Sequence, residues 1–198
     1  MKKFYKVEKF SENNFFNKIN IKNIYLLDFG CGLGVWTSKI KQIKKIKKIL
    51  LYDCNHELHF MIKKKYKSNN KVSICSGMFE ASHKINVVLF GSVIQYLSLN
   101  KLKFLFEKYA KNKNVKYIIM SDIPRLPRLL EFCLLPFFNY KRFIYSIYYL
   151  MEKKYSYFKF YRHEFHKLAN ISKSFTPKKL ENFHATKVLR YSIIYEKK

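Results

Sequence analysis

An apolar strand that ends in an acid and runs into three alternate glycines is the feature that most constrains this chain. Residues 24–29 are apolar apart from Asp28, and Gly30, Gly32 and Gly34 follow before helical spacing begins. Glycine has no Cβ and tolerates positive φ, so such a turn lets a backbone approach a ligand closely. Three of the five glycines in the chain fall here. The segment predicts a strand, a tight ligand-binding loop and a helix; a glycine-rich turn without a ligand is the alternative.

The spacing of these glycines separates two classes of ligand. A dinucleotide fingerprint is G-x-G-x-x-G, with the pyrophosphate at the helix N-terminus. Here the pattern is D-x-G-x-G-x-G, and the acid Asp28 would repel a pyrophosphate while suiting a positive amine or sulfonium. A nicotinamide oxidoreductase would also need glycine at position 35, which is Val35. The segment resembles the first motif of the class I S-adenosylmethionine-dependent methyltransferases, an acid followed by glycines in this pattern.

A second acid supports the same interpretation. Residues 49–52 predict a strand that ends in Asp53, 19 residues after Gly34. An acid at about that distance, at the tip of the next parallel strand, can accept hydrogen bonds from both ribose hydroxyls. In the family that the chain resembles, this acid binds the ribose of S-adenosylmethionine. A solvated loop aspartate is the alternative.

The rest of the chain alternates between strand and helix patterns. Apolar runs predict further strands at 72–75, 84–90 and 115–120, and helical spacing predicts helices at 55–67 and 98–112. Two final strands are expected at 172–180 and 187–196. The run 84–90 is nearly continuous, which is typical of a central strand covered on both faces. The alternation predicts an α/β, doubly wound, largely parallel sheet. The resemblance implies seven strands, mostly parallel, with an antiparallel last strand.

Apolar residues at helical spacing indicate which helix faces are buried. We expect a loose N-terminal helix over 5–20, and a first core helix whose buried face carries Trp36, Ile40 and Ile43. Leu58 and Ile62 should face inward from the next helix. Ser98 is a suitable N-cap for the helix that follows it.

The chain of 198 residues is long enough for one domain with a sizeable core. We expect a single methyltransferase domain over 1–198, and its parts are an N-terminal helix in 1–20, a cofactor-binding core in 21–122, a helical aromatic-rich insertion in 125–170 and closing strands in 172–198. The insertion follows the fifth strand and should form a lid on the acceptor side. Its segment 129–151 is interrupted by polar residues and Pro136, so it suits an amphipathic helix better than a membrane span. Contact with a membrane surface is the alternative.

The net charge of +27 would ordinarily suggest nucleic acid or an anionic membrane surface. Yet only five of the 40 basic residues are arginine, the usual choice for bidentate phosphate recognition. The abundant residues all have A/T-rich codons, so genome bias accounts for much of the excess. The pairs at 44–45 and 47–48 are expected on a solvated helix face.

The cysteines and the N-terminus indicate a compartment. Four cysteines form no CxxC pair, so we expect free thiols in a reducing environment and no metal site. The first residues carry no apolar run or small-residue cleavage site, so no signal peptide is expected. We therefore expect a cytoplasmic protein, and peripheral contact with a membrane through 129–151 is the alternative.

The resemblance also implies the residues that bind S-adenosylmethionine. They lie at the carboxyl ends of the strands, where open α/β sheets bind ligands, and are Asp28, Gly30, Cys31, Gly32, Gly34, Asp53, Met78, Phe79, Gly91 and Ser92. The family usually has an acid for the adenine amino group after the third strand. This chain has none there, and Met78 and Phe79 would hold adenine by apolar and sulfur contacts instead.

Methyl transfer needs positioning above all, and an oxygen acceptor also gains from a general base. Candidates for catalytic residues are His163, His166 and Tyr96, with Asp122 as a further one. The two histidines could equally lie on a helix surface. As a pair they could bind a metal ion, but the sequence offers no evident third ligand.

We therefore predict an S-adenosylmethionine-dependent methyltransferase that acts on a small-molecule or sugar acceptor, at oxygen. The loop from Gly91 to Tyr96 resembles the family's fourth motif, and it lacks the Asn/Asp-Pro-Pro-Tyr sequence of many nucleic-acid enzymes. A nucleic-acid methyltransferase remains an alternative. So does a non-catalytic Rossmann-like domain that binds a partner or a membrane surface.

Overall fold

A single mixed sheet forms the centre of the computed structural model, which describes residues 16–75, 77, 84–124, 174–181 and 190–198. Within these residues the strands are β1 (Ile24–Phe29), β2 (Ile46–Tyr52), β3 (Val72–Ile74), β4 (Val87–Gly91), β5 (Tyr117–Pro124), β6 (Phe175–Glu181) and β7 (Arg190–Lys197). The helices are α2 (Val35–Ile40), α3 (His56–Tyr66) and α4 (Leu99–Lys111), and a short 3₁₀ helix η1 (Ile94–Tyr96) precedes α4.

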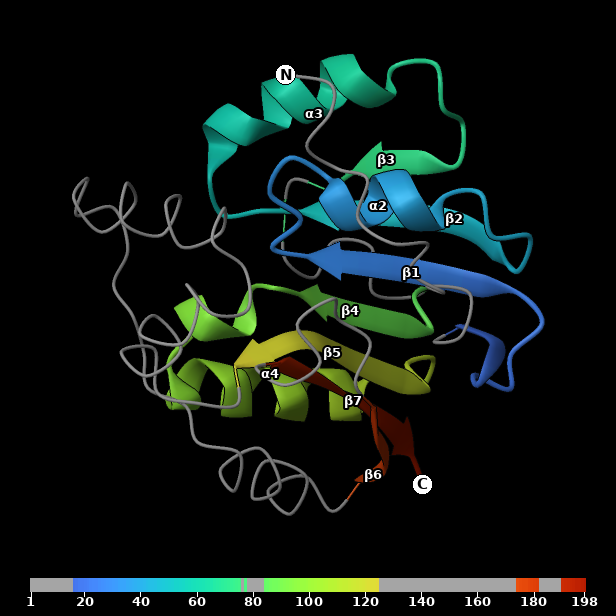
Figure 1. The fold of residues 1–198 in the computed structure, drawn as a ribbon, viewed down its shortest axis with the longest axis vertical. Helices are drawn as coiled ribbons and strands as arrows, with labels where there is room; N and C mark the ends of the chain where they lie inside the picture. The colour runs from blue at the N-terminus through green and yellow to red at the C-terminus, as the bar shows by residue number, and fades with distance from the viewer. Residues whose placement is uncertain (1–15, 76, 78–83, 125–173, 182–189) are drawn as a thin grey trace, which may run out of the picture.

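The strand order is β3-β2-β1-β4-β5-β7-β6 (Figure 1). Strands β1 to β5 pair in parallel with their neighbours, and β7 runs antiparallel to both β5 and β6. This confirms the predicted sheet, with seven strands and an antiparallel last strand. The order reverses between β1 and β4, and ligands bind in such sheets at the carboxyl ends of the strands next to this reversal.

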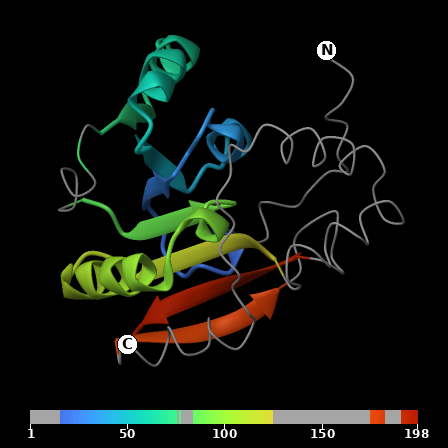
Figure 2. The same ribbon diagram turned by 90° about the vertical axis from the view of Figure 1, so that its left-hand side faces the viewer.

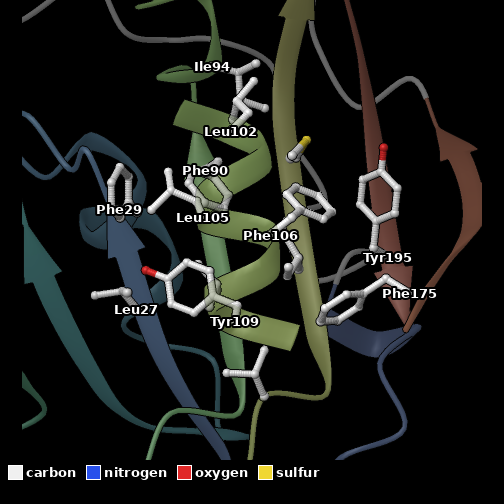
Figure 3. Close-up of a cluster of buried hydrophobic side chains, with 14 of the residues drawn as sticks. Leu27, Phe29, Phe90, Ile94, Leu102, Leu105, Phe106, Tyr109, Phe175 and Tyr195 are labelled. Carbon is white, nitrogen blue, oxygen red and sulfur yellow. The ribbon is translucent and has the colours of Figure 1, made fainter. Parts of the chain in front are cut away.

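The sheet is covered on both faces, which explains the nearly continuous apolar runs of its central strands. In β1, Leu27 and Phe29 face one core and Leu26 faces the other. Helices α2 and α3 cover one face, together with Phe16 and Ile19. Helix α4 covers the opposite face (Figure 3). The rotated view in Figure 2 shows α4 beside the sheet, and it shows β6 and β7 at one edge of the sheet.

The predicted helix faces and caps are largely confirmed. The side chain of Ser98 accepts a hydrogen bond from the backbone N–H of Lys101 and so caps α4. The buried face of this helix carries Leu102, Leu105, Phe106 and Tyr109. Leu58 and Ile62 of α3 face the core as predicted.

Aromatic packing joins α4 to the closing strands. The ring of Phe106 meets the ring of Phe175 at a centroid distance of 6.0 Å and that of Tyr195 at 5.1 Å, both edge to face (Figure 3). Such pairs add to the free energy that their apolar area already contributes. The antiparallel end of the sheet is therefore fixed to the same core as the central strands.

Two expectations for residues 35–48 are wrong. Helix α2 ends at Ile40, and Ile43 lies in the turn after it, although the Ile43 side chain is buried in the same core. The lysines at 44–45 lie in a turn, and Lys47 and Lys48 are exposed in β2, so neither pair lies on a helix. Two successive strand residues are exposed because a register shift at Ile24/Tyr25 leaves Lys47 without a partner opposite it, as in a β-bulge.

Several predictions concern residues outside the described ranges. They are the N-terminal helix before residue 16, the insertion at 125–170 with its segment 129–151, and the starts of the two last strands. Among the described residues, no helix combines the length and the apolar character needed to cross a bilayer.

Candidate active site

The glycine loop between β1 and α2 adopts the left-handed backbone that its sequence predicts. The φ angles are +67° at Gly30, +52° at Gly32 and +67° at Gly34, a region that residues with a Cβ rarely enter. The loop is fixed to the next strand because the backbone N–H groups of Gly30 and Cys31 both donate to the carbonyl of Tyr52, at 2.8 and 3.1 Å.

Neighbouring side chains enclose both ends of this loop, and none of the described residues fills the space at its middle. A Cβ at Gly30 would lie 2.3 Å from Val93 Cγ2, and a Cβ at Gly34 would lie 2.9 Å from the ring of Tyr66. A Cβ at Gly32 would meet no described atom within 4 Å. Gly32 is therefore the point of the loop at which a ligand can approach the backbone.

Asp53 lies at this loop, as the sequence predicts. The backbone N–H of Gly32 donates to its Oδ2 at 2.8 Å, and that of Asn55 donates to its Oδ1 at 3.0 Å. The side chain of His59 contacts the Asp53 carbonyl oxygen at 3.0 Å. Each carboxylate oxygen has two lone-pair directions, so Asp53 keeps acceptor capacity for hydroxyl groups of a ligand.

Asp28 is almost completely buried beneath the loop. The hydroxyl of Thr37 donates to its Oδ2 at 2.6 Å, while its Oδ1 has no hydrogen-bond partner among the described residues. Burial raises the pKa of Asp28 to about 6; the bond from Thr37 opposes this rise, and the nearby charge of Asp53 adds to it. A cationic group near the loop would favour the ionised form of Asp28 and offset the cost of its burial.

The loop after β4 lies against the glycine loop. Besides the approach of Val93 to Gly30, a Cβ at Gly91 would lie only 2.4 Å from Cδ1 of Trp36 in α2. The next residue, Ser92, has a φ of +61°, and its hydroxyl donates to Oδ2 of Asp122 at 2.8 Å. The carboxyl end of β5 thus joins the same edge of the sheet.

The three aspartates of the chain, Asp28, Asp53 and Asp122, all lie at this edge. They belong to the ends of β1, β2 and β5, and their exposed fractions are 1%, 9% and 7%. The chain carries a net charge of +27. Buried carboxylates are costly unless they are paired or hydrogen-bonded, so their concentration here gives a basic protein an acidic site suited to a cationic ligand.

The other predicted site residues are placed as follows. Cys31 is buried in the glycine loop, and burial, with the charges of Asp28 and Asp53, raises the pKa of its thiol far above the ordinary range. It therefore stays a neutral thiol. Tyr96 lies in η1 and is 39% exposed. Met78, Phe79, His163 and His166 lie outside the described residues.

Three contacts of the site were not predicted from the sequence. They are the bond from Thr37 to Asp28, the packing of Trp36 on Gly91, and the bond from the Tyr66 hydroxyl to the Gly34 carbonyl at 2.8 Å. Helical spacing could have indicated Tyr66, which lies one turn after Ile62 on the buried face of α3. Within the described ranges, no cluster of three or more metal-ligating side chains occurs.

Comparison with solved structures identifies the fold. The magnesium protoporphyrin IX methyltransferase ChlM from Synechocystis PCC 6803, solved with bound SAH, matches with a TM-score of 0.64 at 12% identity, over 94% of this chain and 79% of that one. A SAM-dependent methyltransferase from Aquifex aeolicus matches with a TM-score of 0.63 at 12% identity, over 94% and 89%. The chain has the class I methyltransferase fold. The methyltransferase domain of bacterial CtHen1 also matches, with a TM-score of 0.61 at 16% identity, over 93% and 94% of the two chains.

By sequence, no protein-family model and no curated protein matches the chain. The assignment to the methyltransferase fold therefore depends on its three-dimensional arrangement. The sheet order, the antiparallel β7 and the glycine loop after β1 agree with the resemblance found in the first motif.

Proposed function

We propose that this chain is an S-adenosylmethionine-dependent methyltransferase that acts on a small-molecule or sugar acceptor, at oxygen. The observation that carries the proposal is the open, left-handed backbone at Gly32 with the buried carboxylates of Asp28 and Asp53 beside it. A fold alone does not determine function, so the function is inferred from the fit of these residues to the cofactor.

The residues fit S-adenosylmethionine in three respects. The acceptor capacity of Asp53 suits the two ribose hydroxyls. Oδ1 of Asp28, which lacks a hydrogen-bond partner among the described residues, and the charge of Asp28 suit the positive end of the ligand. The open space at Gly32 lets the ligand contact the backbone directly. Gly30, Cys31 and Gly34 would shape the loop, and Gly91 and Ser92 would line its other side.

When bound, S-adenosylmethionine supplies a methyl group on a sulfonium leaving group. The chain's own contribution is to hold the ligand in one orientation and to bring an acceptor in line with the methyl group. Asp53 and the glycine loop fix one end, and the loop from Gly91 to Tyr96 forms the wall on the β4 side. The domain assignment of 1–198, the lid in 125–170 and the catalytic candidates His163, His166 and Tyr96 remain part of this proposal.

Methyl transfer from tritium-labelled S-adenosylmethionine tests the choice of acceptor. Monosaccharides, glycans, small phenols and nucleic acids are offered in parallel at low and moderate salt. A small-molecule or sugar acceptor should be methylated at a rate that changes little with salt. A nucleic-acid acceptor would instead lose affinity by about 10³-fold or more between about 50 and 200 mM salt if it makes several phosphate contacts. Labelling of nucleic acid alone would contradict the proposal.

The ionisation of Asp28 predicts a pH dependence of cofactor binding. Because its pKa is raised to about 6, the carboxylate that favours a cationic ligand is present above pH 6 and is lost below it. The dissociation constant of S-adenosylmethionine should be constant above about pH 7 and rise by up to about tenfold per pH unit below pH 6. The effect of pH on the stability of the ligand-free fold has the opposite direction. Since the folded-state pKa of Asp28 exceeds the ordinary 3.8, this group lowers the free energy of unfolding as pH rises from about 4 to 6.

Calorimetry from pH 5 to 8 measures this effect, and Asp28→Asn is the matched control. An asparagine can still accept the hydrogen bond from Thr37 but does not titrate in this range. The variant should bind more weakly at pH 8 and lose the pH dependence. If wild-type affinity is unchanged between pH 5 and 7.5, or if the variant keeps the full dependence, Asp28 does not interact with the positive charge.

A further inference from the structure

Ser92 and Asp122 form a hydrogen-bonded pair in which both residues have a left-handed backbone. Their φ angles are +61° and +62°, and apart from glycines they are the only residues with positive φ in the described part of the chain. The Ser92 hydroxyl donates to Asp122 Oδ2 at 2.8 Å, and the Ser92 N–H donates to the carbonyl of Ser121 at 3.1 Å. The left-handed region of φ and ψ is unfavourable for a residue with a Cβ, so the surrounding structure must hold the residue there. Residues in this conformation cluster at functional sites.

The fold does not require a carboxylate at position 122. The left-handed conformation follows from the irregular pairing of β5 with β7, whose register shifts between Met120 and Ile123. Glycine and asparagine adopt this left-handed conformation at least as readily as aspartate does. An aspartate with 7% of its surface exposed also bears a desolvation cost that those residues avoid. We therefore infer that the carboxylate at position 122 has a chemical role in the site.

The pair lies beside the glycine loop, on the side opposite to Asp53. The sheet order places β2 on one side of β1, and β4 and β5 on the other. Val93, next to Ser92, is the residue that closely approaches Gly30. In a ligand whose ribose is held by Asp53 of β2, the far end therefore extends toward β4 and β5. The part of S-adenosylmethionine that leaves the ribose in this direction carries first the sulfonium with its transferable methyl group and then the terminal amino acid.

We propose that Asp122, positioned by Ser92, faces the transferable methyl group and is the catalytic base that accepts the proton of the acceptor hydroxyl. This proposal rests on the proposed methyltransferase function. The acceptor oxygen forms a bond to the methyl carbon while the bond from that carbon to sulfur breaks. The electron pair of the broken bond stays on sulfur, which becomes a neutral thioether. The proton of the acceptor moves to the Asp122 carboxylate, whose other oxygen keeps the bond from Ser92.

Sinefungin tests this placement without knowledge of the acceptor. It is an analogue of S-adenosylmethionine in which a carbon bearing an amine replaces the methylated sulfur, so its ammonium group occupies the position of the transferable methyl. S-adenosylhomocysteine has the same ribose and amino acid but no group there. A carboxylate that faces the methyl position should bind the ammonium of sinefungin through a charge-assisted hydrogen bond.

The experiment compares the affinities of both ligands for wild type, Asp122→Asn, Ser92→Gly and the surface control Glu107→Gln. Asparagine and glycine tolerate the left-handed backbone, so both variants at the pair should fold. Asp122→Asn should weaken sinefungin binding by about tenfold or more and leave S-adenosylhomocysteine binding within about twofold. Ser92→Gly should weaken sinefungin binding less, and Glu107→Gln should change neither affinity.

The outcomes separate this inference from the proposed function. Equal losses for both ligands in Asp122→Asn would mean that Asp122 only supports the fold of the site, and unchanged sinefungin binding would mean that it does not face the methyl position. Either result overturns the inference while methyltransferase function stands. If folded wild-type protein binds neither ligand, the proposed function fails and this inference fails with it.

Discussion

Gly30→Ala is expected to lower the free energy of unfolding by about 2–5 kcal/mol, a large part of the 5–15 kcal/mol typical of a domain. The left-handed φ of +67° costs a residue with a Cβ about 1–2 kcal/mol. Its Cβ would also lie 2.3 Å from Val93 Cγ2, and overpacking of this kind costs about 1–3 kcal/mol. Val93 packs against the core and its branched side chain is stiff at χ1, so it cannot easily move away.

Gly32→Ala is the matched variant. The φ angle is +52°, but the new Cβ would meet no described atom within 4 Å. The substitution should therefore lower the free energy of unfolding only by the conformational cost of about 1–2 kcal/mol. Its methyl group would instead project into the space that we assign to the ligand, and cofactor affinity should fall by about tenfold or more, the effect of about 1.4 kcal/mol. Urea unfolding followed by circular dichroism measures stability, and calorimetry measures binding. Equal destabilisation by the two substitutions would contradict the packing described for the loop.

Asp53→Ala is expected to reduce affinity for S-adenosylmethionine and S-adenosylhomocysteine alike, by at least about 100-fold. The two ribose hydroxyls would each lose a hydrogen bond to a charged acceptor, and each such bond is worth about 1.5–3 kcal/mol. The loss should be equal for the two ligands because they share the ribose and differ only at sulfur.

Two further variants make this result interpretable. Asp53→Asn keeps an acceptor oxygen for one of the two N–H groups, that of Gly32 or that of Asn55, so it should fold better than Asp53→Ala and still bind weakly. Glu57→Gln removes an exposed carboxylate from the first turn of α3 and should leave affinity unchanged. A folded Asp53→Asn protein with wild-type affinity for both ligands would remove Asp53 from the site.

The parts of the fold that follow local patterns could be predicted from the sequence. The glycine loop was one of them, since alternate glycines after an acid-terminated strand leave few conformations open. Asp53 could be placed because parallel strands deliver their carboxyl ends to one edge of a sheet. Helix α4 could be predicted with its cap, because the helical period, a serine and an apolar face all agree.

The features that escaped prediction depend on contacts between distant segments. The left-handed pair of Ser92 and Asp122 joins two strand ends 30 residues apart, and nothing local in either segment indicates positive φ. The bulge at Lys47 depends on the register between β1 and β2. The end of α2 at Ile40 escaped because Ile43 continues the helical spacing and is buried from a turn instead.

The most direct test of the account is a calorimetric titration of the wild-type chain with S-adenosylmethionine, S-adenosylhomocysteine and NAD⁺. We expect micromolar binding of the first two ligands, one molecule per chain, and no binding of NAD⁺, because Asp28 would repel a pyrophosphate at the glycine loop. Folded protein that binds neither adenosyl ligand, or that binds NAD⁺ in their place, would contradict the claim that this site is built for S-adenosylmethionine.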